Sequence, residues 1–316
     1  MSDENFTLCP LCGSRRTILA ERIKIDDLIR MGSKMVDWDL SSEFRDVKEE
    51  IGFYNCQDCD LQFFHPAVTG SERYYAELQK FDWYYRKDKE EYDFAHQFIR
   101  PTDCVLEVGC GNGAFARQIS AKHYVGLEFS GEAVSAATAA GVVAIKESIQ
   151  THAALNQGRY DFVCAFQVLE HVAEPRAFVE SCLACTKPGG LVLYSVPSAD
   201  SFLAIGRNFV TNLPPHHVTR WTDQCLKNVE RLFSAELVAL QHEKMAPRHK
   251  KMYASLVILD SLEAALGTQR RVVNRTLRHR MLAKFSNIAA SIVEKGLDNP
   301  WVVPHGPSVT AVYKKI

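Results

Sequence analysis

A glycine-rich segment with acidic residues on both sides is the part of the sequence best suited to bind a cofactor. In the run CVLEVGCGNGAFARQI, a strand-like stretch breaks into three closely spaced glycines, Gly109, Gly111 and Gly113. Glu107 stands two residues before the first glycine, and Glu128 follows at the end of the next strand-like run. The first two glycines and Ala114 satisfy the dinucleotide-binding fingerprint, which taken alone would permit NAD.

The charge of Glu107 favours a different cofactor. Its carboxylate would repel a pyrophosphate placed at this strand end, and Gly113 adds backbone room that a dinucleotide does not require. S-adenosylmethionine has a positive ammonium group and an adenosine but no phosphate. Its ammonium would be neutralised near Glu107, and its ribose diol would donate two hydrogen bonds to Glu128. The segment therefore predicts S-adenosylmethionine, with NAD-dependent oxidation as an alternative.

Two cysteine pairs have the spacing of metal ligands. Each pair has two residues between its thiols, so that a tight turn can direct both sulfurs at one ion, and two such turns complete a tetrahedral site. The pairs occur in CPLCGS and CQDCDLQFFHP, and the four predicted ligands are Cys9, Cys12, Cys56 and Cys59. Four protein ligands leave zinc no open position, so the predicted Zn²⁺ is structural. The alternative is two chance pairs of buried thiols.

A histidine pair is the candidate general base. His216 and His217 follow two prolines in NLPPHHVTRWTDQ, before a helix that we expect to be capped by Thr222. An imidazole is suited to accept a proton from a hydroxyl at neutral pH. The alternative is that one or both imidazoles only pack or cap the helix. His171, in LEHV, is expected to have a structural role in the turn that follows a strand.

Strand-like and helix-like runs alternate after Pro101 and must position these residues. Strands are expected at 104–109, 123–130, 142–148, 160–172 (running into a loop) and 190–198, and helices at 113–120, 131–141 and 175–190. Such alternation predicts an α/β fold with a parallel sheet whose ligands bind beyond the carboxyl ends of the strands. Further strands are expected at 235–243 and 307–315. Two helices lie between them, with a local cluster of Arg270, Arg271, Arg275, Arg278 and Arg280. These arginines either grip an anionic acceptor or form a solvated helix face.

The chain is divided into three parts by these patterns. Residues 1–70 form the predicted zinc-binding module, with a long insertion between its cysteine pairs and a short helix near 23–31. Residues 71–100 form a linker with a helix at 84–99. Residues 101–316 form the cofactor domain, with a helical lid at about 246–300.

Composition limits the class of protein. The chain has 316 residues, is 47% hydrophobic and carries a formal net charge of −1, which argues against nucleic acid as a partner. It shows no secretory signal and no run that could span a membrane. Ten cysteines without an export signal indicate a reducing compartment, and we expect a cytoplasmic protein.

Three motifs in order, LEVGCGNGAFA, VGLEFS and FQVLEHVAEP, resemble class I S-adenosylmethionine-dependent methyltransferases. The resemblance covers about residues 92–243. It implies a Rossmann-like sheet of seven strands with the last antiparallel, methyl transfer as the activity, and glycines that pass under the methionine part of the cofactor. It also implies that Glu128 holds the ribose and that the neighbouring Phe129 belongs to the cofactor site.

The same resemblance extends to two further stretches of the sequence. Ser148 and Ile149, after the third strand, would flank adenine, and Phe166 and Gln167 would line the sulfonium region. The stretch PPHHVTRWT and the cysteine pairs resemble a branch with an N-terminal zinc module, many members of which act on sugars. The additional C-terminal domain of long sugar C-methyltransferases is missing, which favours an oxygen acceptor.

The expected activity is therefore methyl transfer to a hydroxyl of a sugar or related small molecule. Two alternatives are an RNA base methyltransferase, in which the zinc module holds RNA, and a non-catalytic protein that only binds the cofactor. An interface between two subunits along the C-terminal helices stays open as well.

Overall fold

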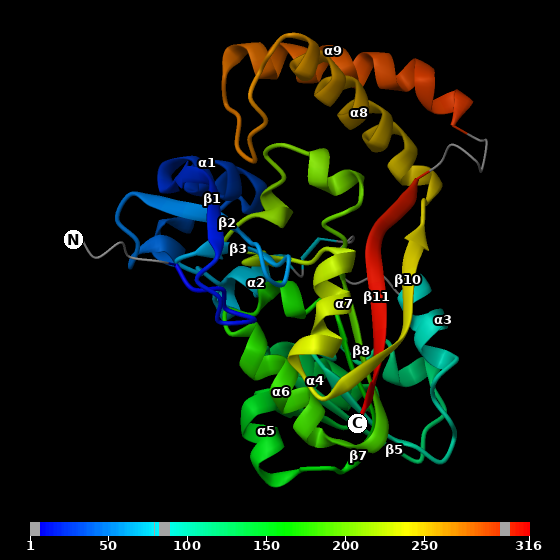
Figure 1. Cartoon of the computed structure of the whole chain (residues 1–316). Helices are drawn as coiled ribbons and strands as arrows, with labels where there is room; N and C mark the ends of the chain where they lie inside the picture. The colour runs from blue at the N-terminus through cyan, green and yellow to red at the C-terminus, as the bar shows by residue number, and fades with distance from the viewer. Residues whose placement is uncertain (1–6, 79, 82–88, 298–303) are drawn as a thin grey trace.

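The computed structural model describes residues 7–78, 80–81, 89–297 and 304–316 of the chain. Figure 1 shows a large central sheet with a smaller sheet beside it and a pair of helices above both. In the part of the chain so described, we find no helix with the length and apolar character that a membrane span requires.

The central sheet has seven strands in the order β10-β11-β8-β7-β4-β5-β6. Pairing is parallel from β8 through β7, β4 and β5 to β6, whereas β11 pairs antiparallel with both of its neighbours. This confirms the predicted Rossmann-like sheet with its last strand antiparallel. Its strands are β4 (Cys104–Val108), β5 (His123–Glu128), β6 (Ala144–Lys146), β7 (Tyr160–Phe166), β8 (Thr186–Pro197), β10 (Ala235–Lys244) and β11 (His305–Lys315).

Both faces of this sheet are covered because successive side chains along a strand point to opposite sides. In β7, Phe162 and Cys164 pack on one face with α3 and Phe115, whereas Val163 and Ala165 pack on the other with α5, α6 and α7. The covering helices have these bounds: α3 (Glu90–His96), α5 (Ile149–Leu155), α6 (Pro175–Cys185) and α7 (Asp223–Leu232). Helix α4 (Gly131–Ala139) connects β5 to β6.

Three helix predictions near the sheet need correction. The helix expected at 113–120 is a turn with a short 3₁₀ helix, η2 (Ala116–Gln118), because the φ of +74° at Gly113 is not helical and Phe115 is held in the core. Helix α6 ends at Cys185 rather than at 190, since β8 already begins at Thr186. Helix α5 was not predicted.

The smaller sheet has the strand order β1-β2-β3-β9. Strands β1 (Thr17–Lys24), β2 (Glu50–Cys56) and β3 (Gln62–His65) come from the N-terminal segment, but β9 (Thr219–Arg220) follows the histidine pair. Helix α1 (Ile25–Val36) follows β1, so the helix expected at 23–31 begins and ends later than predicted. The N-terminal segment therefore shares a sheet with the rest of the chain.

Two other segments join the N-terminal sheet to the cofactor side. Helix α2 (Glu72–Leu78) falls within the expected linker, and its Tyr74 is fully buried beside β2 and β3 residues. The first part of the helix expected at 84–99 lies outside the described residues, and the remainder is α3.

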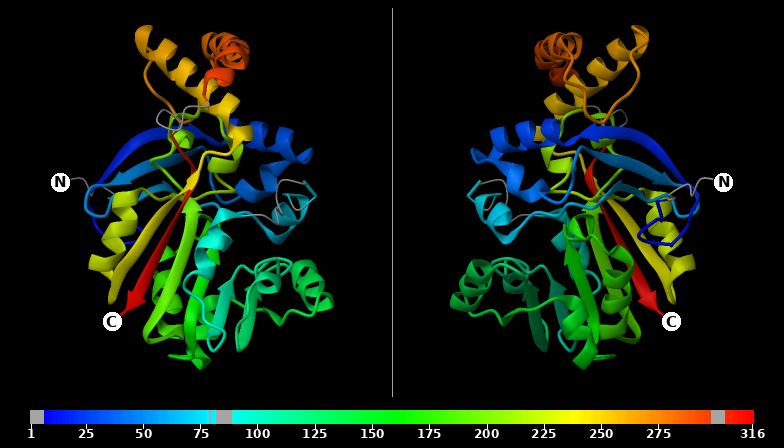
Figure 2. Two further views of the ribbon diagram at one scale, coloured as in Figure 1. Left: turned by 90° about the vertical axis from the view of Figure 1, so that its right-hand side faces the viewer. Right: turned by 90° about the vertical axis from the view of Figure 1, so that its left-hand side faces the viewer.

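The C-terminal insertion forms a helical hairpin of α8 (Lys250–Ala265) and α9 (Leu277–Val293). Figures 1 and 2 show this pair extending beyond both sheets. A buried polar group fastens the hairpin to the fold, since Arg207 pairs with Asp260 at 2.6 Å and with Glu263 at 3.1 Å. The connection between α8 and α9 reaches the N-terminal sheet, where the carboxylate of Glu21 accepts hydrogen bonds from the backbone N–H groups of Val272 and Val273.

Candidate cofactor and acceptor site

One cavity of about 1030 Å³ lies at the carboxyl ends of the parallel strands. The last residues of four strands line it: Val108 of β4, Glu128 of β5, Phe166 of β7 and Pro197 of β8. The histidine pair also lines it, as do Arg248, His249 and Met252 at or just before the start of α8. It is therefore at the position expected for a ligand of such a sheet and is large enough for two small molecules.

The glycine loop forms the floor of the cavity and requires glycine for two reasons. Gly109, Gly111 and Gly113 have φ angles of +78°, +52° and +74°, in the left-handed region that favours glycine. A Cβ atom on Gly109 would also lie 2.4 Å from Cγ2 of Val168. Gly109 and Gly111 line the cavity, whereas Gly113 supports the turn by donating its N–H to the carbonyl of Cys110.

The carboxylate of Glu128 is fixed at the cavity wall by three backbone donors. One oxygen accepts the N–H of Gly111 at 2.9 Å, and the other accepts those of Phe129 at 2.7 Å and Ser130 at 3.0 Å. These bonds leave the carboxylate little freedom to turn, and it keeps further acceptor capacity for a ligand that has hydroxyl groups.

Glu107 is the most buried acidic group of the glycine-loop region, with 2% of its surface exposed. Burial raises the pKa of its carboxyl group to about 7, although the hydroxyl of Tyr124 donates a hydrogen bond to it and Lys89 lies near enough to oppose the shift. A buried carboxylate without a strong cationic partner favours a cationic ligand group. The two carboxylates at this end thus fit a cofactor with an ammonium group and a diol, and they disfavour a pyrophosphate.

Most of the remaining residues of the predicted cofactor site also reach the cavity. Phe129, Ile149, Phe166 and Gln167 all line it. Gln167 is held in a left-handed conformation, with φ +55°, and its amide donates to Glu91 at 3.0 Å.

Ser148 is the exception on the expected adenine side. It is not part of the described cavity wall, and its hydroxyl instead accepts the backbone N–H of Thr151 as the N-cap of α5. Glu147 and Gln150, on either side in sequence, do line the cavity.

The histidine pair lies at the far end of the cavity, together with His171. The rings of His171 and His216 have centroids 4.6 Å apart, and those of His171 and His217 are 4.8 Å apart. One ring nitrogen from each of the three lies within 4.8 Å of those of the other two. Burial lowers the pKa of His216 and of His217 well below the usual value, so both imidazoles are neutral at pH 7.

Sequence reasoning assigned His171 a structural role and gave no role to Glu170, yet both face this cluster. Nε2 of His171 lies 3.6 Å from Oε1 of Glu170, and Nε2 of His217 lies 3.9 Å from the same oxygen. The 3₁₀ helix η3 (Leu169–His171) presents Glu170 and His171 after β7. No local pattern indicated this grouping, because the histidine pair comes from a loop 45 residues later in the chain.

A second group missed by sequence reasoning covers the cofactor end. Glu72 of α2 pairs with Lys146 at the end of β6, with 3.0 Å between Oε1 and Nζ, and both residues line the cavity. Residues 71–100 were expected to be mainly a linker, so α2 was not anticipated as part of the wall.

The described cavity wall includes none of the five clustered arginines. Arg275 instead pairs with Asp27 of α1 at 2.5 Å, and Arg278 donates to the carbonyl of Leu266. Arg248, in the loop before α8, is the arginine that reaches the cavity from this region.

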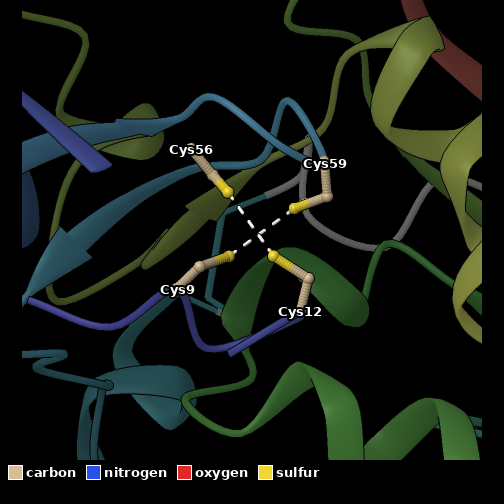
Figure 3. Close-up of side chains that lie close together, drawn as sticks. All are labelled: Cys9, Cys12, Cys56 and Cys59. Atoms are coloured by element: carbon tan, nitrogen blue, oxygen red, sulfur yellow. Dashed lines mark hydrogen bonds between the residues drawn. The ribbon is translucent and has the colours of Figure 1, made fainter. Parts of the chain in front are cut away.

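The four paired cysteines converge on one point outside this cavity, as Figure 3 shows. Sγ of Cys9 lies 3.5 Å from Sγ of Cys59, and Sγ of Cys12 lies 3.5 Å from Sγ of Cys56. A tetrahedron with metal–sulfur bonds of about 2.3 Å has sulfur atoms about 3.8 Å apart, so the observed spacing suits a Zn²⁺ ion. Cys182 and Cys185, which have the same spacing, are buried in α6 and contribute to packing.

Comparison with known proteins agrees with this geometry. A family model described as "Methyltransferase domain" matches residues 83–266, more than half of the chain. Ubiquinone biosynthesis O-methyltransferase of Proteus mirabilis is 32% identical over 123 residues, which cover 35% of this chain and 50% of that protein. The corresponding enzyme of Escherichia coli O7:K1 is 28% identical over 160 residues, covering 46% and 65%. The chain thus spans about half to two-thirds of the length of these curated relatives.

Two solved structures are similar to the chain at low sequence identity. A SAM-dependent methyltransferase of Thermotoga maritima, described as a possible histamine N-methyltransferase, is 17% identical with a TM-score of 0.49, covering 78% of this chain and 98% of that one. A SAM-dependent methyltransferase of Archaeoglobus fulgidus is 15% identical with a TM-score of 0.48, covering 76% and 100%. Because this family model matches more than half of the chain, the chain belongs to the methyltransferase-domain family.

Proposed function

We propose that the protein transfers a methyl group from S-adenosylmethionine to a hydroxyl of a small molecule, such as a sugar or a sugar nucleotide. The observation that carries this proposal is the single cavity that joins Glu107 and Glu128 at one end to the histidine cluster at the other. When bound, S-adenosylmethionine supplies an electrophilic methyl group on a positively charged sulfur.

The residues of the chain would contribute mainly by alignment. Glu128 would accept the ribose hydroxyls, Glu107 would balance the ammonium group, and the glycine loop would allow close approach of the backbone. Phe166 and Gln167 line the same cavity as the histidines. Holding two reactants in line for a displacement can lower a barrier by about 7–11 kcal/mol.

An oxygen acceptor is supported from two sides. The curated relatives are named O-methyltransferases, and neutral imidazoles line the acceptor end of this cavity. In this proposal His216 or His217 accepts the proton of the hydroxyl as the oxygen–carbon bond forms. The proton then passes to water at the mouth of the cavity.

We also propose that Cys9, Cys12, Cys56 and Cys59 hold a structural Zn²⁺. The site would brace the N-terminal sheet against the cofactor domain, because the backbone carbonyl of Leu11 accepts from Arg176 of α6 and Asp60 accepts the hydroxyl of Thr222. With four protein ligands, zinc would supply folding stability and take no part in methyl transfer.

The proposal is tested with purified protein, S-adenosylmethionine and a panel of sugars, sugar nucleotides and phenols, by mass spectrometry. The expected result is a gain of one CH₂ unit on at least one hydroxylated acceptor, lost in the His216→Ala and His217→Ala variants. Methylation on carbon or nitrogen only, or normal turnover by both variants, would overturn the assignment of the acceptor or of the histidines.

A further inference from the structure

Four ionisable side chains meet at the acceptor end of the cavity. They are Glu170 and His171 of η3 and the histidine pair, and all four line the cavity. The three histidines bring one ring nitrogen each to within 4.8 Å of the others. Oε1 of Glu170 lies 3.6 Å from Nε2 of His171 and 3.9 Å from Nε2 of His217.

The hydrogen bonds that His171 and His217 make through Nδ1 determine the protonation state of Nε2, the ring nitrogen nearer to Glu170. Nδ1–H of His171 donates to the backbone carbonyl of His216 at 2.5 Å, and Nδ1–H of His217 donates to Oδ1 of Asn212 at 3.2 Å. In a neutral imidazole the other nitrogen, Nε2, is then unprotonated. A histidine whose outer N–H is held by a carbonyl or amide oxygen is the usual arrangement of a metal ligand.

Glu170 and His216 leave polar atoms without partners at this point. Glu170 is 1% exposed, and among the described residues neither of its oxygens has a hydrogen-bond partner; the same is true of Nδ1 of His216. Buried polar atoms are almost always satisfied in folded proteins. A cation or a proton at this point would satisfy Oε1 of Glu170 and the two imidazole nitrogens that lie 3.6 and 3.9 Å from it.

We infer that Glu170, His171, His216 and His217 form a binding site for a divalent transition-metal ion, with an open position that faces the acceptor. Three imidazole nitrogens and one carboxylate suit ions such as Zn²⁺, Fe²⁺, Co²⁺ or Mn²⁺ better than Mg²⁺ or Ca²⁺, which prefer oxygen. Ligand atoms around such an ion lie about 3.3 Å apart for bonds near 2.05 Å. Oε1 of Glu170 is 3.6 and 3.9 Å from two of the imidazoles, and the three histidine nitrogens lie within 4.8 Å of one another, so ligands would move inward by up to about 1.5 Å to close on an ion.

The metal site does not depend on the proposed function. The role of the ion toward the acceptor does rest on the proposed function. An ion with five or six ligands keeps a position that an acceptor hydroxyl can occupy, and coordination lowers the pKa of the bound oxygen. The hydroxyl proton would then leave to water in the cavity, and the oxygen would form its bond to the methyl carbon as the carbon–sulfur bond breaks and S-adenosylhomocysteine leaves. With an ion bound, His216 and His217 would hold it, and the ion would take over the activation of the hydroxyl that the proposed function assigns to one of these imidazoles.

The test is the metal content of the full-length protein, purified without chelators and measured by inductively coupled plasma mass spectrometry. We expect Glu170→Gln and His171→Asn each to lower the number of bound transition-metal ions by one per chain. His123→Asn is the matched control, because it removes an exposed imidazole outside the cavity and should leave the count unchanged. Asn212→Ala keeps every ligand and should weaken the affinity of this site about 10–100-fold.

Co²⁺ loading separates this site from the cysteine site. A four-cysteine site gives a strong sulfur charge-transfer absorption, whereas an imidazole and carboxylate site gives only weak ligand-field bands. We expect both signals in the wild-type protein and loss of the ligand-field component alone in His171→Asn. The inference is overturned if the His171→Asn and wild-type proteins bind the same number of Co²⁺ ions, or if only Mg²⁺ binds.

The outcomes also separate this inference from the proposed function. Methyl transfer by protein that holds no ion outside its cysteines would overturn the metal site and leave direct proton transfer to an imidazole. A bound ion in protein that methylates no acceptor would support the site and overturn the proposed function.

Discussion

The carboxylate of Glu128 accepts a hydrogen bond from the backbone N–H of Gly111, with 2.9 Å between Oε2 and N. This bond joins the end of β5 to the turn that follows β4, so that one side chain both shapes the glycine loop and faces the cavity. Glu128 and the glycine loop, which are separate in the sequence, are therefore parts of one binding surface.

Replacement of Glu128 is expected to weaken cofactor binding. Glu128→Ala removes the acceptor for the ribose hydroxyls, and a pair of hydrogen bonds to a charged group contributes on the order of 3 kcal/mol, or roughly 100-fold in affinity. The dissociation constant of S-adenosylhomocysteine, from calorimetry, checks this. Glu132→Ala is the control, because Glu132 is exposed on α4 and outside the cavity wall. Equal affinity in the two variants would contradict the role given to Glu128.

Gly109 is expected to tolerate no side chain. Gly109→Ala adds a Cβ atom 2.4 Å from Cγ2 of Val168 at a φ of +78°. Strain and overpacking together should lower the free energy of unfolding by about 2–4 kcal/mol. Gly158→Ala is the matched control, since its φ is +57° but no atom lies within 4 Å of the added Cβ. Urea unfolding should show the larger loss for Gly109→Ala, and equal losses would mean that Val168 can move aside.

The affinity for the cofactor should increase with pH through the titration of Glu107. Its pKa is raised to about 7, chiefly by burial, so the free protein loses the carboxylate form as the pH falls below 7. A cationic ammonium group binds the carboxylate form, so affinity should rise by up to about tenfold per pH unit below 7 and level off above it. Glu107→Gln should bind more weakly and show no such slope between pH 6 and 8.

The carboxyl group of Glu107 should also make the ligand-free protein less stable as the pH rises, whereas cofactor affinity increases. Because the folded state holds this proton more tightly than the unfolded state, the free energy of unfolding should decrease as the pH rises from about 4.5 to 7. Glu107→Gln should remove that part of the decrease in denaturant unfolding. A wild-type protein whose curve coincides with that of the variant would show that Glu107 titrates normally.

The four-cysteine site should bind one zinc ion that stabilises the fold. Cys12→Ser removes one ligand of the convergent set, and loss of the ion should lower the midpoint of thermal unfolding by several degrees. The control is Cys104→Ser, which changes a half-buried thiol at the start of β4. Zinc analysis of both variants checks the prediction, and a full complement of zinc in Cys12→Ser would contradict it.

Much of the fold was predictable because its signals are local. Alternating strand and helix patterns after Pro101 identified the strands of the central sheet, and the glycine and cysteine spacings marked segments that the structure brings to one cavity and to one convergent cluster. The Thr222 cap of α7 was also predicted, and its hydroxyl accepts the N–H of Cys225. In each case neighbouring residues decide the conformation.

The parts that were missed depend on contacts between distant segments. Strand β9 has two residues, and its pairing with β3 exists only in the folded chain. The grouping of Glu170 and His171 with the histidine pair likewise requires η3 and the loop before β9 to meet. No periodicity or spacing along the chain reports such a meeting, so the sequence alone could not reveal it.

Isothermal titration calorimetry of the purified protein tests the central claim most directly, with S-adenosylhomocysteine and NAD⁺ as the two titrants. We expect the first to bind with one site per chain and the second to give no measurable heat of binding. Binding of NAD⁺ without binding of S-adenosylhomocysteine would contradict the assignment of the cavity to a cofactor that carries an ammonium group and no phosphate.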